Sequence, residues 1–393
     1  MSRILHKITP VFSEFPEISE TTPNINRTFT AEEEYIKKCQ EGVLFDGKRI
    51  KVAEPKVSFL VPIYNKAKYL PLALRSVQNQ SLEDIEIVCL DDGSTDNSVE
   101  VVEKFQKDDP RIVLYKHEKN MGTGTTRAHL GQYAKGKYLM WLDPDDAYCS
   151  PDAAKMAYEK AEKTGADIVH FKSLSGKLDE ICIRTRRSPT ISGIMKQPQL
   201  SHALYNRDDK DKELIAIDTA NMWNKLFLKM TYIAAMNFLG EERWKEHLCV
   251  CEDLLQSFAI FNVAKCYAEL DHIAYFYNYN PDSITHKLLA TKHEKLIDQK
   301  KADYLISNRI TACKFIFELS KNTAEGKSDA ARILKRCFSK EKRKAYALSG
   351  YVDKIKDLMQ MFLDCEYVLE GDKKYIKEYL DDILKLSLAN QTK

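Results

Sequence analysis

The chain has 393 residues, of which 44% are hydrophobic and 30% are charged, with a formal net charge of +2 at pH 7. This is ordinary for a globular protein large enough for more than one structural unit. The balanced charge gives no sign of the basic face that nucleic-acid binding requires, and no apolar stretch is long enough to be a transmembrane segment.

The ten cysteines are scattered, without the repeated two-residue spacing of a zinc site. Prolines and a glutamate interrupt residues 1–17 before the apolar core of a signal peptide could form. We therefore expect reduced thiols and a cytoplasmic protein, either free or peripheral at a membrane surface.

The first 55 residues predict an extended arm and one short helix, without recognisable chemistry. From residue 56 onward, short apolar runs alternate with amphipathic segments, which predicts strands joined by helical crossovers. We expect Pro62 to end the first strand. The predicted strands cover 57–61, 85–90, 112–115 and the run from 138, and the predicted helices cover 69–80, 98–106 and 127–134.

The second half is less regular. It predicts a helix over 151–163, a strand over 166–171, irregular chain over 172–215, a polar segment leading to Cys251, a helix over 254–261 and a strand from 267 to 279. From residue 291 only helical periodicity with abundant charge remains. The predicted fold class is α/β with a mostly parallel sheet flanked by helices and a helical C-terminal appendage. The expected regions are 1–55, 56–286 and 287–393, and the last is a candidate surface for a homo-oligomer.

The most informative stretch is 138–146 (YLMWLDPDD), an apolar run that ends in three carboxylates. Pro144 cannot join a strand ladder, so Asp143, Asp145 and Asp146 should lie just past the end of a buried strand. In open α/β sheets the carboxyl ends of the strands are where ligands bind. Crowded carboxylates require a cation, hydrogen-bond donors or raised pKa values. A divalent metal would satisfy them, and an acidic solvated loop is the alternative.

A second pair of carboxylates, Asp91 and Asp92, follows the strand over 85–90 and should reach the same edge of the sheet. This pair could bind a ligand or simply cap the next helix. The Gly- and Thr-rich segment 120–126 precedes a helix and could meet phosphates with its amide groups. Such loops are common, so by itself this segment indicates little.

Three blocks together, VSFLVPIYN, IEIVCLDDGSTDNS and AKGKYLMWLDPDD, resemble the family 2 glycosyltransferases of GT-A fold. The resemblance is specific over about residues 56–150 and looser through 223–227, 251–261 and 274–285. The wording of the later blocks is typical of members that build bacterial or protist surface polysaccharides. The resemblance implies a nucleotide-sugar donor, most simply a UDP-sugar, and Mn²⁺ or Mg²⁺ as cofactor.

The resemblance also implies roles for single positions on the nucleotide side. Pro62, Tyr64 and Asn65 lie where the family lines the base. Asp92 matches the carboxylate that accepts from uracil, and Arg127 matches the arginine of a Gly-x-x-x-x-Arg block. This chain then departs from the family, because residues 127–130 read RAHL where most members have Arg-Asn-x-Gly. The departure puts the fine geometry of the diphosphate loop in question.

On the metal side, Asp143 and Asp145 fit the family's Asp-x-Asp motif. The resemblance places Asp143 nearer the ribose and Asp145 on the metal, with Asp146 in support. His286 could complete the site, as a late histidine does in some GT-A enzymes, although a lone histidine is more often structural.

For catalysis, Asp253 lies where inverting members keep their general base, and Glu252 precedes it. A plain helix-capping role is the alternative for both, because carboxylates favour helix N-termini. Trp223, Lys225 and Glu252 are candidates for contacts to the acceptor or the donor sugar, and Trp223 could equally be core.

These residues predict a metal-dependent inverting glycosyltransferase that moves a sugar from a UDP-sugar to a hydroxyl of a glycan, lipid-linked or protein acceptor. One alternative is a sugar nucleotidyltransferase, which the absence of a Gly-rich triphosphate loop near the first strand disfavours. The other is a non-catalytic nucleotide-sugar-binding or scaffold protein. No motif identifies the sugar or the acceptor.

Overall fold

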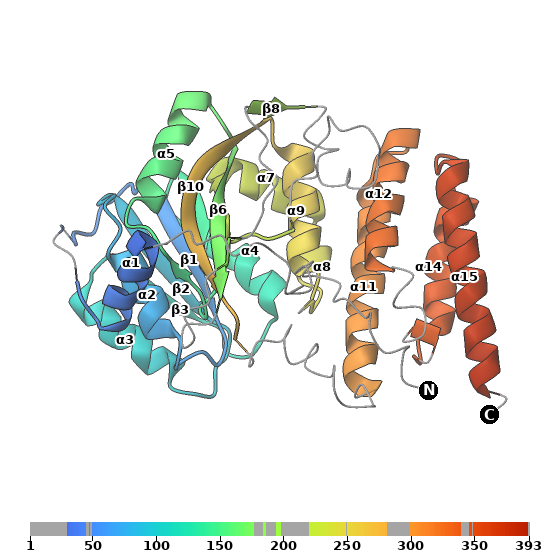
Figure 1. The fold of residues 1–393 in the computed structure, drawn as a ribbon, viewed down its shortest axis with the longest axis horizontal. Coiled ribbons are helices and arrows are strands. Elements are labelled where there is room, and N and C mark those ends of the chain that lie inside the picture. The colour runs from blue at the N-terminus through green and yellow to red at the C-terminus, as the bar shows by residue number, and fades with distance from the viewer. Residues whose placement is uncertain are drawn as a thin grey trace. The chain divides into compact units, whose positions relative to one another are not determined.

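The computed structural model describes residues 30–44, 47, 49–176, 184–185, 194–197, 220–248, 250–280, 299–338, 346–347 and 349–391. The chain divides into two compact units, Thr28–Asn280 and one that contains the C-terminal helices (Figure 1). Helix α1 (Thr30–Gln40) belongs to the first unit, where the Tyr35 hydroxyl donates to the Ser76 carbonyl at 2.8 Å.

One mixed sheet forms the centre of the first unit, with strand order β3-β2-β1-β4-β9-β6-β10-β5. Strands β3, β2, β1 and β4 are parallel, whereas β9 runs antiparallel to both β4 and β6. The α/β fold class is therefore confirmed, with an antiparallel strand inserted in the second half of the sheet. The strands are β1 (Val57–Ile63), β2 (Ile85–Asp91), β3 (Ile112–Lys116), β4 (Tyr138–Trp141), β5 (Ala147–Tyr148), β6 (Ile168–Gly176), β7 (Arg184–Thr185), β8 (Ile194–Lys196), β9 (Lys225–Leu228) and β10 (Cys266–Asn278).

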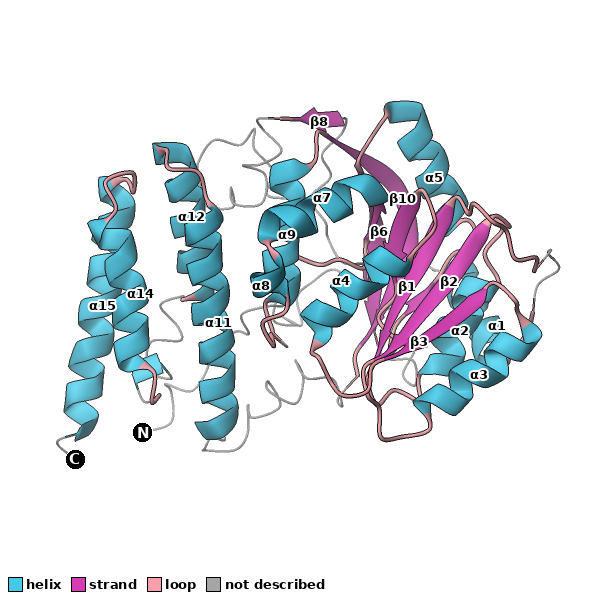
Figure 2. Cartoon of the chain, turned by 180° about the vertical axis from the view of Figure 1, so that it is seen from behind, coloured by secondary structure: helices cyan, strands magenta, loops and turns pink. Residues whose placement is uncertain are grey.

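Helices cover both faces of this sheet. Figure 2 shows α1, α2 and α3 on one face and α4, α7 and α9 on the other. Strands β1 and β2 are buried along their whole length, which explains why their sequences are continuous apolar runs rather than alternating ones. The remaining helices of this unit are α2 (Leu70–Gln78), α3 (Ser98–Asp108), α4 (Thr123–Tyr133), α5 (Ala153–Thr164), α7 (Lys229–Leu239), α8 (Glu241–Trp244) and α9 (Glu252–Val263).

Pro62 does not end β1, contrary to the sequence-based prediction. The strand continues to Ile63 and stays paired with β2. The Leu60 carbonyl accepts from Leu142 on the β4 side, so Pro62, two residues later, also faces that side. Strand β4 ends opposite Leu60, and the missing N–H of Pro62 therefore lies past the end of its pairing.

Helix α4 begins at Thr123, four residues earlier than predicted. The Gly- and Thr-rich segment is thus not only a loop, because residues 123–126 form the first turn of the helix. Gly122, which precedes it, has φ of 89°, a conformation that favours glycine. A side chain on Gly122 would also meet the His247 ring at 3.2 Å.

The second half of the unit holds more regular structure than the sequence predicted. Strand β6 runs on to Gly176, and β7 and β8 also lie in the segment expected to be irregular. Helix α7 was not predicted, because Lys229–Leu239 is apolar on most sides and lacks a clear 3.6-residue pattern. One face packs against α4 and α9, whereas Met230 and Phe238 are 69% and 39% exposed, so apolar residues on the solvent face blur the pattern.

The C-terminal unit is helical, as predicted. Its Thr323 hydroxyl accepts from the Gly326 amide and caps one helix, and the rings of Phe317 and Phe362 lie 4.4 Å apart between two others. In the described part of the chain no helix has the length and apolar character needed to cross a membrane. The helices are α11 (Gln299–Leu319), α12 (Ala324–Cys337), α14 (Val352–Asp364) and α15 (Glu370–Gln391).

Candidate active site

The acidic loop, residues 143–146, follows β4 and is held in place by β10. Asp146 is 2% exposed, and its two carboxylate oxygens accept from the Tyr275 hydroxyl and the Asn278 amide, each at 2.9 Å. The Asp143 amide donates to the same Tyr275 hydroxyl at 3.1 Å. Burial raises the pKa of Asp146 well above its usual range, and the charges of Asp145 and Asp143 raise it further. Asp146 therefore has a structural role, because its hydrogen bonds attach the loop to β10.

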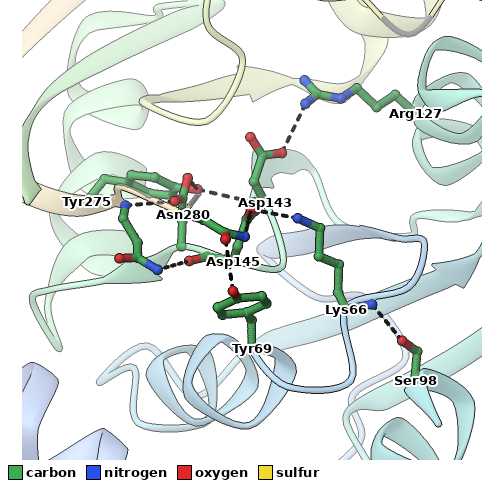
Figure 3. Close-up of polar contacts among 10 residues, drawn as sticks. Lys66, Tyr69, Ser98, Arg127, Asp143, Asp145, Tyr275 and Asn280 are labelled. Atoms are coloured by element: carbon green, nitrogen blue, oxygen red, sulfur yellow. Dashed lines mark hydrogen bonds and ion pairs between the residues drawn. The ribbon is translucent and has the colours of Figure 1, made fainter. Parts of the chain in front are cut away.

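Asp143 forms an ion pair with Arg127, a residue of helix α4. One guanidinium nitrogen lies 3.0 Å from Asp143 Oδ1, and the guanidinium carbon lies 5.5 Å from the Trp141 ring centroid (Figure 3). Burial raises the pKa of Asp143, the Arg127 charge opposes that rise, and the Asp145 charge adds to it. The Arg127 side chain is 6% exposed and that of Asp143 is 24% exposed, so the pair is buried on the guanidinium side and partly open to water on the carboxylate side.

Asp145 is bound by two side chains that the sequence-based prediction left out. The Lys66 ammonium lies 2.7 Å from Asp145 Oδ2, and the Asn280 side-chain amide donates to the same oxygen at 2.8 Å. The Tyr69 hydroxyl in turn donates to Asn280 Oδ1 at 2.8 Å. Figure 3 shows Lys66 and Asn280 converging on this carboxylate. Each of the three carboxylates thus has a different set of protein partners.

Two further carboxylates, Glu252 and Asp253, open helix α9. Cys251 precedes them with φ of 72°, and Asp253 Oδ1 accepts from the Leu254 amide at 2.7 Å within the first turn of the helix. A side chain on Gly124 would lie 3.4 Å from Glu252 Cβ, so the first turns of α4 and α9 are in close contact.

Arg127 connects the acidic loop electrostatically to the start of α9. Burial alone would lower its pKa, but the negative charges of Asp143, Glu252 and Asp253 outweigh that effect and raise it. One guanidinium therefore balances carboxylates on both sides. Its Nε and one terminal nitrogen are buried and donate no hydrogen bond within the described residues, which leaves donors for a ligand.

Glu252 makes stability depend on pH. Burial, together with the Asp253 charge, raises its pKa from 4.5 to about 7. Its contribution to stability is therefore complete below pH 4.5 and is lost as the pH rises to 7. We expect Glu252→Gln to match the wild type near pH 4.5 and to be more stable at pH 8, by up to about 3 kcal/mol. Urea unfolding at the two pH values measures this, and an equal gain at both would contradict it.

The predicted nucleotide side is built from the turns after β1 and β2. Asn65 has φ of 53°, and its side-chain oxygen accepts from the Thr95 amide at 2.8 Å. The Asn65 amide donates to the Ser94 hydroxyl at 2.9 Å, which ties the two turns together. Tyr64 is 43% exposed and so presents a ring beside them. Pro62 lies in the buried strand below.

Asp92 and Asp91 have distinct surroundings. Asp92 accepts from the Met121 and Gly122 amides at 2.8 and 3.0 Å, and His117 Nδ1 lies 2.7 Å from its Oδ1. Asp92 thus fixes the segment before α4. Asp91 accepts from the Ser94 amide through Oδ2, whereas its buried Oδ1 receives no hydrogen bond from any described residue. Asp91 thus keeps one buried carboxylate oxygen unpaired among the described residues.

Trp223 and Lys225 lie in the core beside the acidic loop. The Trp223 ring is 5% exposed and stacks on Tyr275 with centroids 4.7 Å apart. Lys225 is fully buried, and its ammonium donates to Asn224 Oδ1 at 2.6 Å. A supporting role for Trp223 behind Tyr275 follows directly from this stacking. A sugar contact by either residue stays a prediction, and His286 lies outside the described residues.

Several residues that hold the acidic loop were not predicted, because little in the sequence marks them as site residues. Lys66 follows Asn65 in the VPIYN block, and Asn278 and Asn280 belong to the AYFYNYNPDSIT block, but neither block reveals which side chains turn toward the acidic loop. Tyr275 is one of several aromatic residues in the sequence of β10, and only the structure shows that its hydroxyl binds the acidic loop.

The chain is similar to known glycosyltransferases. The model of the family described as glycosyl transferase family 2 matches residues 58–228. The uncharacterized glycosyltransferase EpsJ of Bacillus subtilis is 28% identical over 267 residues, which are 66% of this chain and 73% of EpsJ. The poly(ribitol-phosphate) beta-glucosyltransferase of Bacillus spizizenii is 32% identical over 127 residues, 31% of this chain but 20% of that protein.

Among solved structures, S. aureus TarS 1-349 in complex with UDP-GlcNAc has a TM-score of 0.59 and 17% identity, and the match covers 86% of this chain and 92% of that one. This likeness confirms the overall fold. The chain spans most of EpsJ, but only 37% of the S. pneumoniae glycosyltransferase GlyG.

Proposed function

Since residues 58–228 form a family 2 glycosyltransferase domain, we propose that the chain transfers a sugar from a UDP-sugar to a hydroxyl of a glycan, lipid-linked or protein acceptor, with inversion at the anomeric carbon. The observation that carries the proposal is the position of Arg127. It is paired with Asp143 on the acidic loop, and the charges of Glu252 and Asp253 raise its pKa. The Arg127 guanidinium would thus serve both the acidic loop, where the diphosphate would bind, and the start of α9, which carries the proposed general base.

The donor is proposed to be a uridine nucleotide. The TarS structures whose fold this chain shares contain UDP or UDP-GlcNAc, which supports that choice. The exposed ring of Tyr64 is suited to stack on a base, and Asp91 Oδ1, an acceptor left unpaired among the described residues, lies at the end of β2. Asp92 lies next to Asp91, in the role that the family resemblance implies. The unpartnered nitrogens of Arg127 are suited to phosphate oxygens.

The acidic loop also fits a divalent metal, although not as a preformed cage. In the described part of the chain no three His, Cys, Asp or Glu side chains converge as ion ligands. Asp143 and Asp146 are occupied by Arg127, Tyr275 and Asn278, whereas Asp145 already attracts a cation, the Lys66 ammonium. Mg²⁺ is usually bound by one or two carboxylates together with substrate phosphates. Asp145 would hold such an ion, which would neutralise charge on the leaving diphosphate.

Asp253 is the proposed general base. Its carboxylate would accept the proton of the acceptor hydroxyl while that oxygen bonds to the anomeric carbon. The bond from that carbon to the diphosphate oxygen breaks in the same step, so UDP leaves from the opposite face. One displacement of this kind inverts the anomeric centre.

The test of this proposal is Asp145→Ala. We expect it to lower UDP affinity measured with Mn²⁺ by at least about tenfold, to leave the weaker affinity in EDTA unchanged, and to reduce UDP-sugar turnover. Calorimetric titration of UDP with and without Mn²⁺ provides the measurement.

Asp84→Ala is the matched control, because Asp84 forms a surface ion pair with Lys56 and should change nothing. Unchanged metal-dependent binding and turnover in Asp145→Ala would show that the metal assignment is wrong. Metal-dependent UDP binding by the wild type without any turnover would instead favour a non-catalytic binding protein.

A further inference from the structure

We propose that Lys66 is a built-in counter-ion of Asp145, which a divalent cation must displace when it binds. The inference rests on the proposed function, because it assumes that Asp145 is the carboxylate that binds metal. It assigns a positioning role to a residue that none of the family motifs discussed above includes.

The ion pair is a short and sheltered one. Lys66 Nζ lies 2.7 Å from Asp145 Oδ2, with side-chain exposures of 20% and 14%. Ion pairs that are partly removed from water are screened less than surface pairs and interact more strongly. An ammonium at this distance and a metal ion on the same oxygen would occupy overlapping space, since Mg²⁺ binds oxygen at about 2.1 Å.

The turn that carries Lys66 is fixed at its backbone. The Lys66 amide donates to the Ser98 hydroxyl at 2.9 Å, and the next amide, of Ala67, donates to Asp96 Oδ2 at 3.0 Å. Figure 3 shows the side chain extending from this turn to the acidic loop. Lys66 therefore starts from a fixed point, and only its side chain has to move for the ammonium to leave Asp145.

The contacts around Asp145 form a closed ring. The ammonium lies 5.7 Å from the Tyr69 ring centroid, the Tyr69 hydroxyl donates to Asn280, and Asn280 donates back to Asp145. Asn280 and Lys66 share Oδ2, and Oδ1 accepts no hydrogen bond from the residues that the structure describes. The ring holds the carboxylate in one orientation. A divalent ion bound at Oδ1 would still lie beside the ammonium on the same carboxylate and repel it, so the two cations compete at either oxygen.

Charge balance gives the reason for such an arrangement. Three carboxylates occupy four consecutive positions, and each needs compensation. Asp143 has Arg127, and Asp146 is buried and accepts two hydrogen bonds. Lys66 supplies the compensation at Asp145, so the loop is electrostatically balanced before any ligand arrives. A metal ion then replaces one positive charge with two, at the moment when a diphosphate can take up the excess.

The experiment is a Mn²⁺ titration without nucleotide, with free Mn²⁺ followed by electron paramagnetic resonance. Lys66→Met removes the ammonium but keeps an unbranched chain. We expect it to bind Mn²⁺ about tenfold more tightly than the wild type, because the competing cation is gone. Mn²⁺ should also raise its Tm by more than that of the wild type, because in the variant Asp145 is uncompensated without metal.

Lys68→Met is the matched control, because Lys68 is an exposed lysine two residues away. Its ammonium also lies over the Tyr69 ring, 5.2 Å from the centroid, but of these two lysines, both in the described part of the chain, only Lys66 forms an ion pair with Asp145. It should bind Mn²⁺ as the wild type does. Lys66→Gln provides a second variant in case Lys66→Met folds poorly. Mn²⁺ binding by both Lys66 variants that equals or falls below the wild-type value, or is absent, overturns the proposal.

Failure of this inference and failure of the proposed function are distinguishable. The Mn²⁺ titration uses no nucleotide, and it reports competition at Asp145 even for a protein without transferase activity. If the wild type binds and turns over a UDP-sugar in a metal-dependent way while the Lys66 variants show no gain in Mn²⁺ affinity, only the counter-ion role is wrong.

Discussion

Asp253→Asn is expected to lower sugar transfer by about 10³-fold, within the range typical of a lost general base. The amide cannot accept the proton, but its oxygen can still accept from the Leu254 amide, as Asp253 Oδ1 does. The start of α9 should therefore stay intact, and UDP affinity should change by less than about twofold. The rate of UDP release from a UDP-sugar in the presence of acceptor, beside a calorimetric UDP titration, measures both effects.

Glu252→Gln is the neighbouring control for this experiment. It removes a carboxylate from the same helical turn, so a loss that merely reflects charge at the start of α9 would appear in both variants. If Asp253→Asn keeps activity within tenfold of the wild type, the base lies elsewhere. Glu252 would become the first candidate if its variant alone were inactive.

Arg127→Met is expected to destabilise the protein by about 3 kcal/mol, the lower end of the effect of removing one partner from a buried ion pair, because the Asp143 side chain is 24% exposed. Arg127 is 5% exposed, and its loss leaves Asp143 without its cation near two further carboxylates. The expected outcome in urea unfolding is a lower midpoint with an unchanged slope. Nucleotide binding should weaken in parallel.

A second substitution separates electrostatics from packing in this case. Asp143→Asn in the Arg127→Met background should restore a large part of the lost stability, because it removes the carboxylate that was left uncompensated. Simple additivity of the two substitutions would contradict the ion-pair explanation. It would assign the loss to the contact between the guanidinium and the Trp141 ring.

The sequence predicted well those parts that depend on short-range pattern. The apolar runs of β1, β2 and β4 follow from burial on both faces, and the acidic residues that end β2 and β4 mark where those two strands stop. Their common edge follows from parallel order. The positions of Asp91, Asp92 and the acidic loop were therefore accessible without coordinates.

The side chains that bind these carboxylates could not be predicted from the sequence. Whether Asp143 is compensated by Arg127 or Lys66 depends on side-chain directions that no periodicity encodes. Pro62 shows the same limit, because its tolerance in β1 depends on where the neighbouring strand β4 ends. Helix α7 was missed because its solvent face carries the apolar residues Met230 and Phe238, which hide the amphipathic pattern.

The hold of β10 on the acidic loop has a consequence for how the protein is made. Asp146 accepts from Asn278, 132 residues downstream, and the Asp143 amide donates to Tyr275 at the same separation. During synthesis the three carboxylates emerge from the ribosome long before these partners do, and contacts of such separation form late in folding. The parallel strands can pair early, whereas the loop carboxylates gain their native orientation only once β10 has joined the sheet. A nascent chain arrested at residue 228, where the match to the family model ends, would hold every acidic residue of the loop and lack the strand that orients them.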